Sequence, residues 1–406
     1  MLDRRSFGAA AALTCLLAGA AVAEPKYGPG TSATEIKVGQ TIAYSGPASA
    51  YGQLGKVEDA YFKSLNAKGG INGRKITFIS LDDGYSPPKA VENARKLVES
   101  ENVALVFNIL GTPLNMAVRP YLNQRKVPQL FIAAGATDFN NPAKFPWTMG
   151  WQPNLQAEAA FYAKDLLAKK PNAKVAVLYQ NDDFGKDLLH GLEIALGDKA
   201  KTMIVDSQNF QATDPTIDSQ LITLKASGAD TLFLFTYAKQ AAQAITKLDD
   251  LAWKPRTYLH LGAASVGATF KPAGLERSKG ILSAGFLKDV TDPKWANDDD
   301  VKEWMAWMKD TMPGAELSDS LNEAGYMYAK TLEQVLKQCG DDLTRENVMK
   351  QAANLKDVVL DLGLPGMKIN TTPDDYRVNK QLQMMKFNGE RWEMFGPILE
   401  DAGPAG

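Results

Sequence analysis

Short apolar runs alternate with longer amphipathic segments along most of the chain. The runs Val103–Phe107 (VALVF) and Thr231–Phe235 (TLFLF) are apolar throughout, which is typical of strands buried on both faces of a parallel sheet. On this pattern the predicted strands are Ile36–Ile42, Ile76–Leu81, Val103–Leu110, Gln129–Ala133, Lys174–Tyr179, Met203–Asp206, Thr231–Thr236, Tyr258–Leu261 and Ile281–Phe286.

The segments between these strands predict helices. After Gly52, the apolar residues Leu54, Val57, Tyr61 and Leu65 recur at the spacing of one helix face. A second helix is expected to begin at Ser86, because a serine followed by two prolines suits a helix N-terminus. Strands that alternate with helices favour right-handed βαβ units, so an α/β protein with doubly wound sheets is predicted.

Two similar lobes are expected. A strand, a polar loop and a helix follow one another from Ile36 and again from Lys174. A chain of 406 residues is long enough for two ordinary domains. The stretch 142–153 is rich in proline, glycine and tryptophan, and it is the first candidate crossing between the lobes.

The first residues have the pattern of a targeting segment. Arg4 and Arg5 precede an apolar run over 7–22, and Ala21-Val22-Ala23 forms a small-residue cleavage site. Residues 1–23 are therefore predicted to be a signal peptide, either an ordinary secretory signal or a twin-arginine signal. Residues 24–34 are interpreted as a linker, and the mature protein is expected in the periplasm.

Composition narrows the classes of function. Lys and Arg number 45 against 47 Asp and Glu, for a net charge of −2, whereas nucleic-acid binding needs a basic surface. Cleavage after Ala23 would leave Cys339 as the one cysteine, so no intramolecular disulfide is expected. No later apolar run is long enough to span a bilayer. A soluble monomer without a nucleic-acid partner is predicted.

Residues that could carry out catalysis are few. Of the two histidines, His190 falls in a predicted helix and His260 in a predicted strand, and both are interpreted as surface or core residues. Paired acids such as Asp82-Asp83 and Asp182-Asp183 could serve a hydrolase or bind calcium. Solvated turns and helix caps are the favoured interpretation of these acids. No catalytic residue, metal site or cofactor is predicted, and a hydrolase is the less favoured alternative.

Small polar or aromatic residues follow several of the predicted strands. In open α/β sheets, ligands bind outside the carboxyl ends of the strands, and residues with little or no side chain let a ligand approach the backbone. These loops predict a ligand-binding cleft, and they are 45–51, 111–113, 134–137 and 181–184.

The chain resembles the leucine/isoleucine/valine-binding proteins of bacterial ABC importers. The resemblance is carried in order and spacing by IKVGQTIAYSGPASAYG (36–52), LNAKGGINGRKI (65–76), LDDGYSPPKAVENARKLVE (81–99), KVPQLFIAAGAT (126–137), LYQNDDFGKDL (178–188) and GYMYAKTLEQVL (325–336). It implies a type I periplasmic binding protein with two Rossmann-like lobes joined by a three-segment hinge. The lobe segments expected from crossings near Gly150, Leu282 and Pro365 are 35–150, 151–282, 283–365 and 366–406.

The resemblance also implies a ligand site between the lobes. It places a ligand carboxylate at Leu110, Gly111 and Thr112 and at Gly135, Ala136 and Thr137. Ser45 and Tyr51 are expected on the same side of the cleft, with Phe184 and Tyr237 facing them from the other lobe. The implied partner is an ABC permease in the inner membrane, which would recognise the closed, liganded form. A binding protein that feeds a signalling receptor is the alternative.

One position departs from the family pattern. Amino-acid binders of this family place an acid after the strand that ends near Leu261, to pair with the ligand ammonium, but this chain has Gly262, Ala263, Ala264 and Ser265 there. A buried ammonium without a partner costs several kcal/mol. The hypothesis is therefore that Ala264 faces a hydrophobic or aromatic carboxylate without an α-ammonium, rather than an amino acid.

Overall fold

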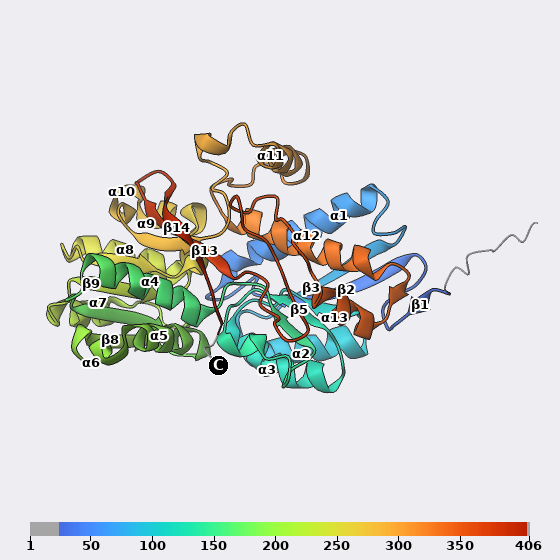
Figure 1. Cartoon of the computed structure of the whole chain (residues 1–406), viewed down its shortest axis with the longest axis horizontal. Helices are drawn as coiled ribbons and strands as arrows, with labels where there is room; N and C mark the ends of the chain where they lie inside the picture. The colour runs from blue at the N-terminus through green and yellow to red at the C-terminus, as the bar shows by residue number, and fades with distance from the viewer. Residues whose placement is uncertain (1–23, 404–406) are drawn as a thin grey trace, which may run out of the picture.

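The computed structural model describes residues 24–403, so the predicted signal peptide lies outside the described residues. Two α/β lobes lie side by side (Figure 1), each built on its own sheet. We call the part built on the five-stranded sheet the first lobe and the part built on the seven-stranded sheet the second lobe. The predicted α/β class with two doubly wound lobes is confirmed.

The first lobe has a parallel sheet with the strand order β3-β2-β4-β5-β6. Its strands are β2 (Glu35–Ile42), β3 (Lys75–Asp82), β4 (Leu105–Phe107), β5 (Gln129–Ile132) and β6 (Thr148–Gly150). The helices of this lobe are α1 (Gly52–Ala67), α2 (Pro87–Glu99), α3 (Thr112–Gln124), α11 (Asp299–Thr311), α12 (Leu321–Cys339) and α13 (Arg345–Ala352). Segments far apart in sequence meet here, because α12 packs along α1 (Figure 1). A short strand pair joins β1 (Lys26–Tyr27) to β12 (Asp342–Leu343).

The second lobe has a mixed sheet with the order β14-β13-β11-β10-β9-β7-β8. Its strands are β7 (Val175–Gln180), β8 (Ile204–Phe210), β9 (Thr231–Phe235), β10 (Arg256–Leu259), β11 (Leu282–Gly285), β13 (Gln381–Phe387) and β14 (Trp392–Glu400). Its helices are α4 (Leu155–Lys169), α5 (Asp183–Leu196), α6 (Ala200–Met203), α7 (Asp218–Ala226), α8 (Ala238–Asp250), α9 (Lys271–Ala273) and α10 (Leu275–Ser278). A π-helical turn spans Val266–Phe270.

The predicted strands all contain a strand of the structure or overlap one, but the sequence analysis did not include the C-terminal hairpin. Strands β13 and β14 pair antiparallel with each other, and β13 pairs antiparallel with β11. The run Val103–Leu110 is also mostly irregular, since only Leu105–Phe107 is strand. Its backbone leaves the extended region at Asn108, where φ is 49°.

The chain passes between the lobes after β6, after β11 and before β13. The second crossing differs from the expected position near Leu282. Ser283 and Ala284 pair with Met385 and Met384 of β13, so the chain leaves the second sheet after Gly285. Leu282–Gly285 therefore belongs to the second lobe.

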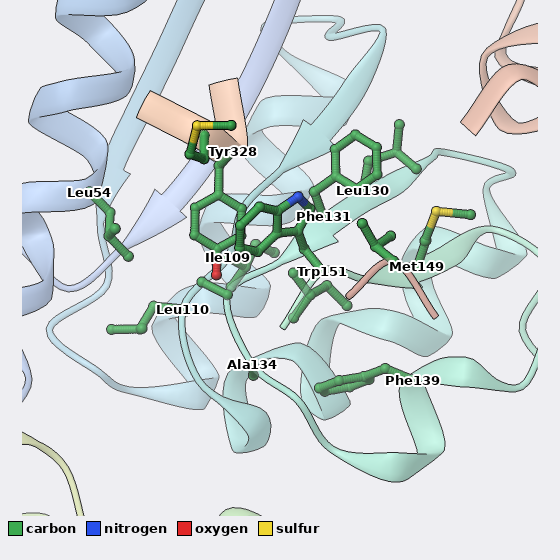
Figure 2. Packing of buried hydrophobic residues seen from close by; sticks show 14 of the residues in the cluster. Leu54, Ile109, Leu110, Leu130, Phe131, Ala134, Phe139, Met149, Trp151 and Tyr328 are labelled. Atoms are coloured by element: carbon green, nitrogen blue, oxygen red, sulfur yellow. The ribbon is translucent and has the colours of Figure 1, made fainter. Parts of the chain in front are cut away.

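The first crossing begins at Trp151, directly after β6, and Trp151 packs into a core with other aromatic residues (Figure 2). Trp151 is fully buried, and its ring lies 4.2 Å from that of Tyr328 and 5.5 Å from that of Phe286, measured between centroids. Its indole N–H donates to Thr331 Oγ1 at 3.1 Å. Because Tyr328 and Thr331 lie on α12, Trp151 fixes the start of the hinge to the first lobe.

Candidate ligand-binding site

A cavity of about 140 Å³ lies between the two lobes. Its volume is close to that of an apolar protein cavity of about 150 Å³ that binds benzene, so one aromatic ring or a short aliphatic chain would fill it. Most of its lining is apolar, and the apolar and aromatic residues are Tyr51, Leu54, Leu110, Ala133, Ala134, Pro153, Leu155, Phe184, Tyr237, Leu261, Ala264, Val266, Ala284, Phe286, Leu287, Leu321, Ala324, Tyr328, Met385, Trp392 and Met394.

The lining follows the carboxyl ends of parallel strands. Ala133 to Gly135 follow β5, Tyr237 follows β9, and His260 to Ala264 follow β10. Phe184 lies in the first turn of α5, just beyond β7. This placement is the one expected for ligands of doubly wound sheets, and the loops predicted from the sequence supply part of it.

Three of the predicted site residues form an aromatic cluster that joins the lobes. Tyr237 stacks on Phe184 with ring centroids 4.5 Å apart, and the ring of Tyr51 meets Tyr237 edge-on at 5.1 Å. The Tyr51 hydroxyl donates to the carbonyl of Gly262 at 2.9 Å and accepts the N–H of Ala238 at 3.1 Å. Burial raises the pKa of Tyr51 above its ordinary value, so this hydroxyl keeps its proton. Tyr51 thus connects the first lobe to two loops of the second.

Leu110, Gly135 and Ala264 also line the cavity, so six of the predicted residues meet there, namely Tyr51, Leu110, Gly135, Phe184, Tyr237 and Ala264. Gly111 does not. Its φ is 88°, and an added Cβ would lie 2.6 Å from the ring of Tyr85, which packs against it. Tyr85 thus covers the backbone that the resemblance assigned to the carboxylate.

The other predicted residues also lie away from the cavity, for local reasons. Ser45 is exposed, and its hydroxyl donates to Asp82 at 2.6 Å. Thr112 is fully buried at the start of α3, and its hydroxyl has no partner among the described residues. Thr137 donates its N–H (2.8 Å) and its hydroxyl (3.0 Å) to Asp187 of the second lobe. Ala136, beside it, is buried without lining the cavity. Asp187 thus accepts both hydrogen bonds of Thr137, a residue that the resemblance assigned to the ligand carboxylate.

His260 lines the cavity, which the sequence analysis did not predict. It is 5% exposed, as a core histidine would be, but β10 ends at Leu259 and His260 is the first residue of the following loop. Its Nδ1 lies 3.0 Å from both carboxylate oxygens of Glu158. Glu158 comes from α4 and is itself fully buried. The signal that could have identified His260 is its position directly after a strand, which it shares with the predicted ligand-binding loops.

Two acids from other parts of the chain also reach the cavity. Glu323 of α12 is 4% exposed, and Asp289 follows β11. Burial raises the pKa of Glu323 well above its ordinary value, and the nearby charge of Asp289 raises it further. Trp392 donates its backbone N–H to Asp289 at 3.2 Å and its indole N–H to the carbonyl of Ala264 at 2.8 Å. The absence of an acid at Gly262–Ser265 therefore does not leave this cavity without acids.

Other contacts hold the lobes together outside the cavity. Ser265 donates its hydroxyl to Asp319 at 2.8 Å, and the N–H of Gly267 donates to the carbonyl of Ser318 at 2.8 Å. Lys271 forms an ion pair with Glu316 at 2.6 Å. Together with the bonds of Tyr51 and Thr137, these contacts describe a closed arrangement around the cavity.

Two of the paired acids cap helices as predicted, whereas Asp83 is fully buried rather than solvated and accepts the hydroxyl of Thr41 at 2.9 Å. Asp182 accepts the N–H groups of Phe184 and Gly185 at the start of α5, and Asp298 accepts that of Val301 at the start of α11. Within residues 24–403, no group of His, Cys, Asp and Glu has the arrangement of a metal site. None of the helices in this range is long and apolar enough to cross a bilayer.

Comparison with known proteins identifies the family. The family described as periplasmic binding protein matches residues 35–391. A Leu/Ile/Val-binding protein homolog 7 from Brucella suis biovar 1 is 24% identical over 299 residues, which covers 70% of this chain and 69% of the relative.

Solved structures share the fold. A branched-chain amino acid ABC transporter protein from Thermus thermophilus with bound valine superposes with a TM-score of 0.81 at 15% identity, covering 91% of this chain and 97% of the other. A solute-binding protein from R. palustris in complex with 4-hydroxybenzoate gives a TM-score of 0.76 at 19% identity, covering 91% and 99%. With two lobes, an enclosed cavity between them and a match over residues 35–391, the chain belongs to the periplasmic binding protein family and is a solute-binding protein related to the Leu/Ile/Val-binding proteins.

Proposed function

We propose that this protein traps a small carboxylate, either an amino acid or a hydrophobic or aromatic acid, between its lobes and delivers it to an ABC importer. The observation that carries the proposal is the cavity of about 140 Å³ at the carboxyl ends of the strands, closed by contacts between the lobes. The names of the similar proteins support it, since one structure holds valine and another holds 4-hydroxybenzoate.

The lining favours an acid with an apolar body. Stacked aromatic rings and aliphatic side chains would contact a ring or a branched chain, and apolar surface removed from water contributes roughly 25 cal/mol per Å². Burial raises the pKa of Glu323 well above its ordinary value, which disfavours a negative charge at this position in the cavity. An acid without an α-ammonium is therefore our first candidate, as the departure at Ala264 had indicated.

The place of action and the partner follow from this role. A protein that delivers solutes to an ABC permease works outside the cytoplasmic membrane, so we place it in the periplasm. The permease is expected to recognise the closed form, because ligand binding shifts the population toward that form.

A thermal-shift screen tests the proposal. The chain, produced with its own leader, is melted with benzoate, 4-hydroxybenzoate, hexanoate, L-leucine and L-valine, and with benzamide as an uncharged control. A ligand present at 100 times its dissociation constant adds about 2.7 kcal/mol to the free energy of unfolding. We expect at least one acid to raise the melting temperature and benzamide to leave it unchanged. Stabilisation by none of the acids, or conversion of one into a product, would contradict the proposal.

A further inference from the structure

A hydrogen-bond donor that carries positive charge binds a carboxylate more strongly than a neutral donor does. Among the described residues that line the cavity, Lys288 and His260 are the two that can carry such a charge. The Lys288 ammonium is already engaged, since it lies 2.9 and 2.8 Å from the two carboxylate oxygens of Asp298 and donates to the carbonyl of Asp361 at 3.0 Å. His260 is therefore the remaining candidate.

The imidazole of His260 has one side occupied and one side open. Nδ1 lies against the Glu158 carboxylate, whereas no hydrogen bond to Nε2 is found within residues 24–403. The ring is held by an edge contact with Phe184, with centroids 4.8 Å apart. A ring fixed on one nitrogen presents the other in a constant direction.

Glu158 fixes the orientation of the imidazole. Its carboxylate is fully buried and accepts the hydroxyl of Tyr162 and the N–H of Leu261, both at 2.8 Å. A buried carboxylate needs hydrogen-bond partners for its oxygens, and Nδ1 of His260 lies 3.0 Å from both of them. The titratable groups that contact the pair are Tyr162 of α4 and Tyr237 before α8. With Nδ1 engaged in this way, Nε2 is the ring nitrogen left to donate to a ligand.

Gly262 keeps the open side of the ring accessible. A Cβ added at this position would lie 2.5 Å from His260 Nε2, which is closer than side-chain carbons come in real proteins. Gly262 itself lines the cavity. Gly262 lies in the segment where the family pattern has an acid, and its lack of a side chain leaves space beside Nε2 of His260.

We propose that His260, oriented by Glu158, binds the ligand carboxylate through its Nε2–H, so that the second lobe holds the anionic end of the ligand. This inference rests on the proposed function, because it assumes a carboxylate ligand. It assigns the role to a residue other than Gly111, Thr112 and Thr137 of the first lobe, which the resemblance had implied. Glu158 acts as a positioning residue, because it holds the ring at Nδ1 and leaves Nε2 open.

Calorimetry on variants tests this assignment with the acids of the screen, benzoate first. His260→Gln removes the imidazole, and Gly262→Ala places a Cβ 2.5 Å from Nε2, so that this edge of the ring must shift. A hydrogen bond to a charged group accounts for about 10- to 100-fold in affinity, so both variants should weaken binding by about that factor. His190→Gln, on the exposed face of α5, is the matched control and should bind like the wild type.

The outcomes separate the two proposals. If the wild type binds none of the acids, the proposed function fails and this inference fails with it. If the wild type binds an acid and both variants bind it within about threefold of the wild type, only the inference is overturned. Loss of binding in His260→Gln alone, with Gly262→Ala unchanged, would also overturn it, because the open Nε2 edge would then be irrelevant.

Nitrogen NMR of histidine-labelled wild-type protein gives a readout that does not depend on a variant folding. The chain has two histidines, and the spectrum of His190→Gln assigns them. In the saturated complex we expect His260 to carry a proton on Nε2. An unprotonated Nε2 in the wild-type complex would overturn the inference.

Discussion

At the scale of single residues, Tyr51 and Glu323 show how burial sets behaviour in the cavity. The hydroxyl of Tyr51 belongs to the first lobe, but both of its partners, the carbonyl of Gly262 and the N–H of Ala238, belong to the second. These bonds exist only while the lobes are closed. They therefore contribute to ligand affinity rather than to the stability of either lobe.

Tyr51→Phe should weaken ligand binding by about 30-fold, because each of the two lost hydrogen bonds contributes about 1 kcal/mol. The melting temperature of the free protein should change little. Tyr44→Phe is the control, since the Tyr44 hydroxyl bonds Ser80 at 2.7 Å within the first lobe. Calorimetry with the acid found by the screen measures both variants, and equal affinities for the two would contradict the bridging role of Tyr51.

Glu323→Gln should alter how stability depends on pH. Burial raises the pKa of Glu323 above its ordinary value of 4.5, so the folded state binds this proton more tightly than the unfolded state. The stabilising contribution is complete below the unfolded pKa and is lost as the pH rises toward the folded pKa. Glutamine does not titrate, so the variant should gain stability relative to the wild type at pH 8 compared with pH 5.

Urea unfolding at both pH values measures the effect. The exposed Glu193 of α5 provides the control as Glu193→Gln. A difference between Glu323→Gln and the wild type that is the same at pH 5 and pH 8 would show that Glu323 is ionised in the folded protein.

At the scale of elements, helix α5 makes a hydrogen-bonded contact with the first lobe that is separate from the one made by Tyr51. Asp187, on its second turn, accepts the N–H and the hydroxyl of Thr137, and its other oxygen accepts the amide of Gln156 at 2.7 Å. The loop after β5 is thus held by a carboxylate from the facing lobe. Since Thr137 lies outside the cavity, this contact resists opening without touching the ligand.

Asp187→Ala should speed ligand release, with a rise in the dissociation rate of about 30-fold, because two bonds of about 1 kcal/mol that resist opening are lost. Stopped-flow displacement measures this rate. Glu193→Ala removes the same charge from the exposed face of the same helix and should leave the rate unchanged. If the two variants release ligand equally fast, Asp187 does not hold the lobes closed.

At the scale of the whole molecule, the described arrangement is closed, and the strand order leaves three connecting segments as the hinge. Domains joined in this way change their relative orientation while each core stays intact. Trp151 and Tyr328 hold the first connection firmly against α12, so bending there would involve the whole end of the first lobe.

The free protein is expected to be more open than the liganded one. Small-angle X-ray scattering should therefore record a smaller radius of gyration when the ligand is present at saturation, because binding favours the closed state. Benzamide at the same concentration is the control. An identical scattering curve with and without a bound acid would contradict closure by a hinge.

The sequence by itself determined the two sheets, most strands and the residue types at the strand ends, because a strand buried on both faces must be apolar over its own short length. Tyr51, Phe184 and Tyr237 followed from such local patterns and from the resemblance. The C-terminal hairpin was missed although Asn388-Gly389, between β13 and β14, is a turn pair typical of hairpins; only the pairing of β13 with β11 joins segments about 100 residues apart. Only the tertiary structure decided that Tyr85 covers Gly111, that Asp187 accepts the hydrogen bonds of Thr137 and that His260 lines the cavity. His260 and Glu158 are 102 residues apart, and they meet only when the second lobe folds and brings α4 against the loop after β10.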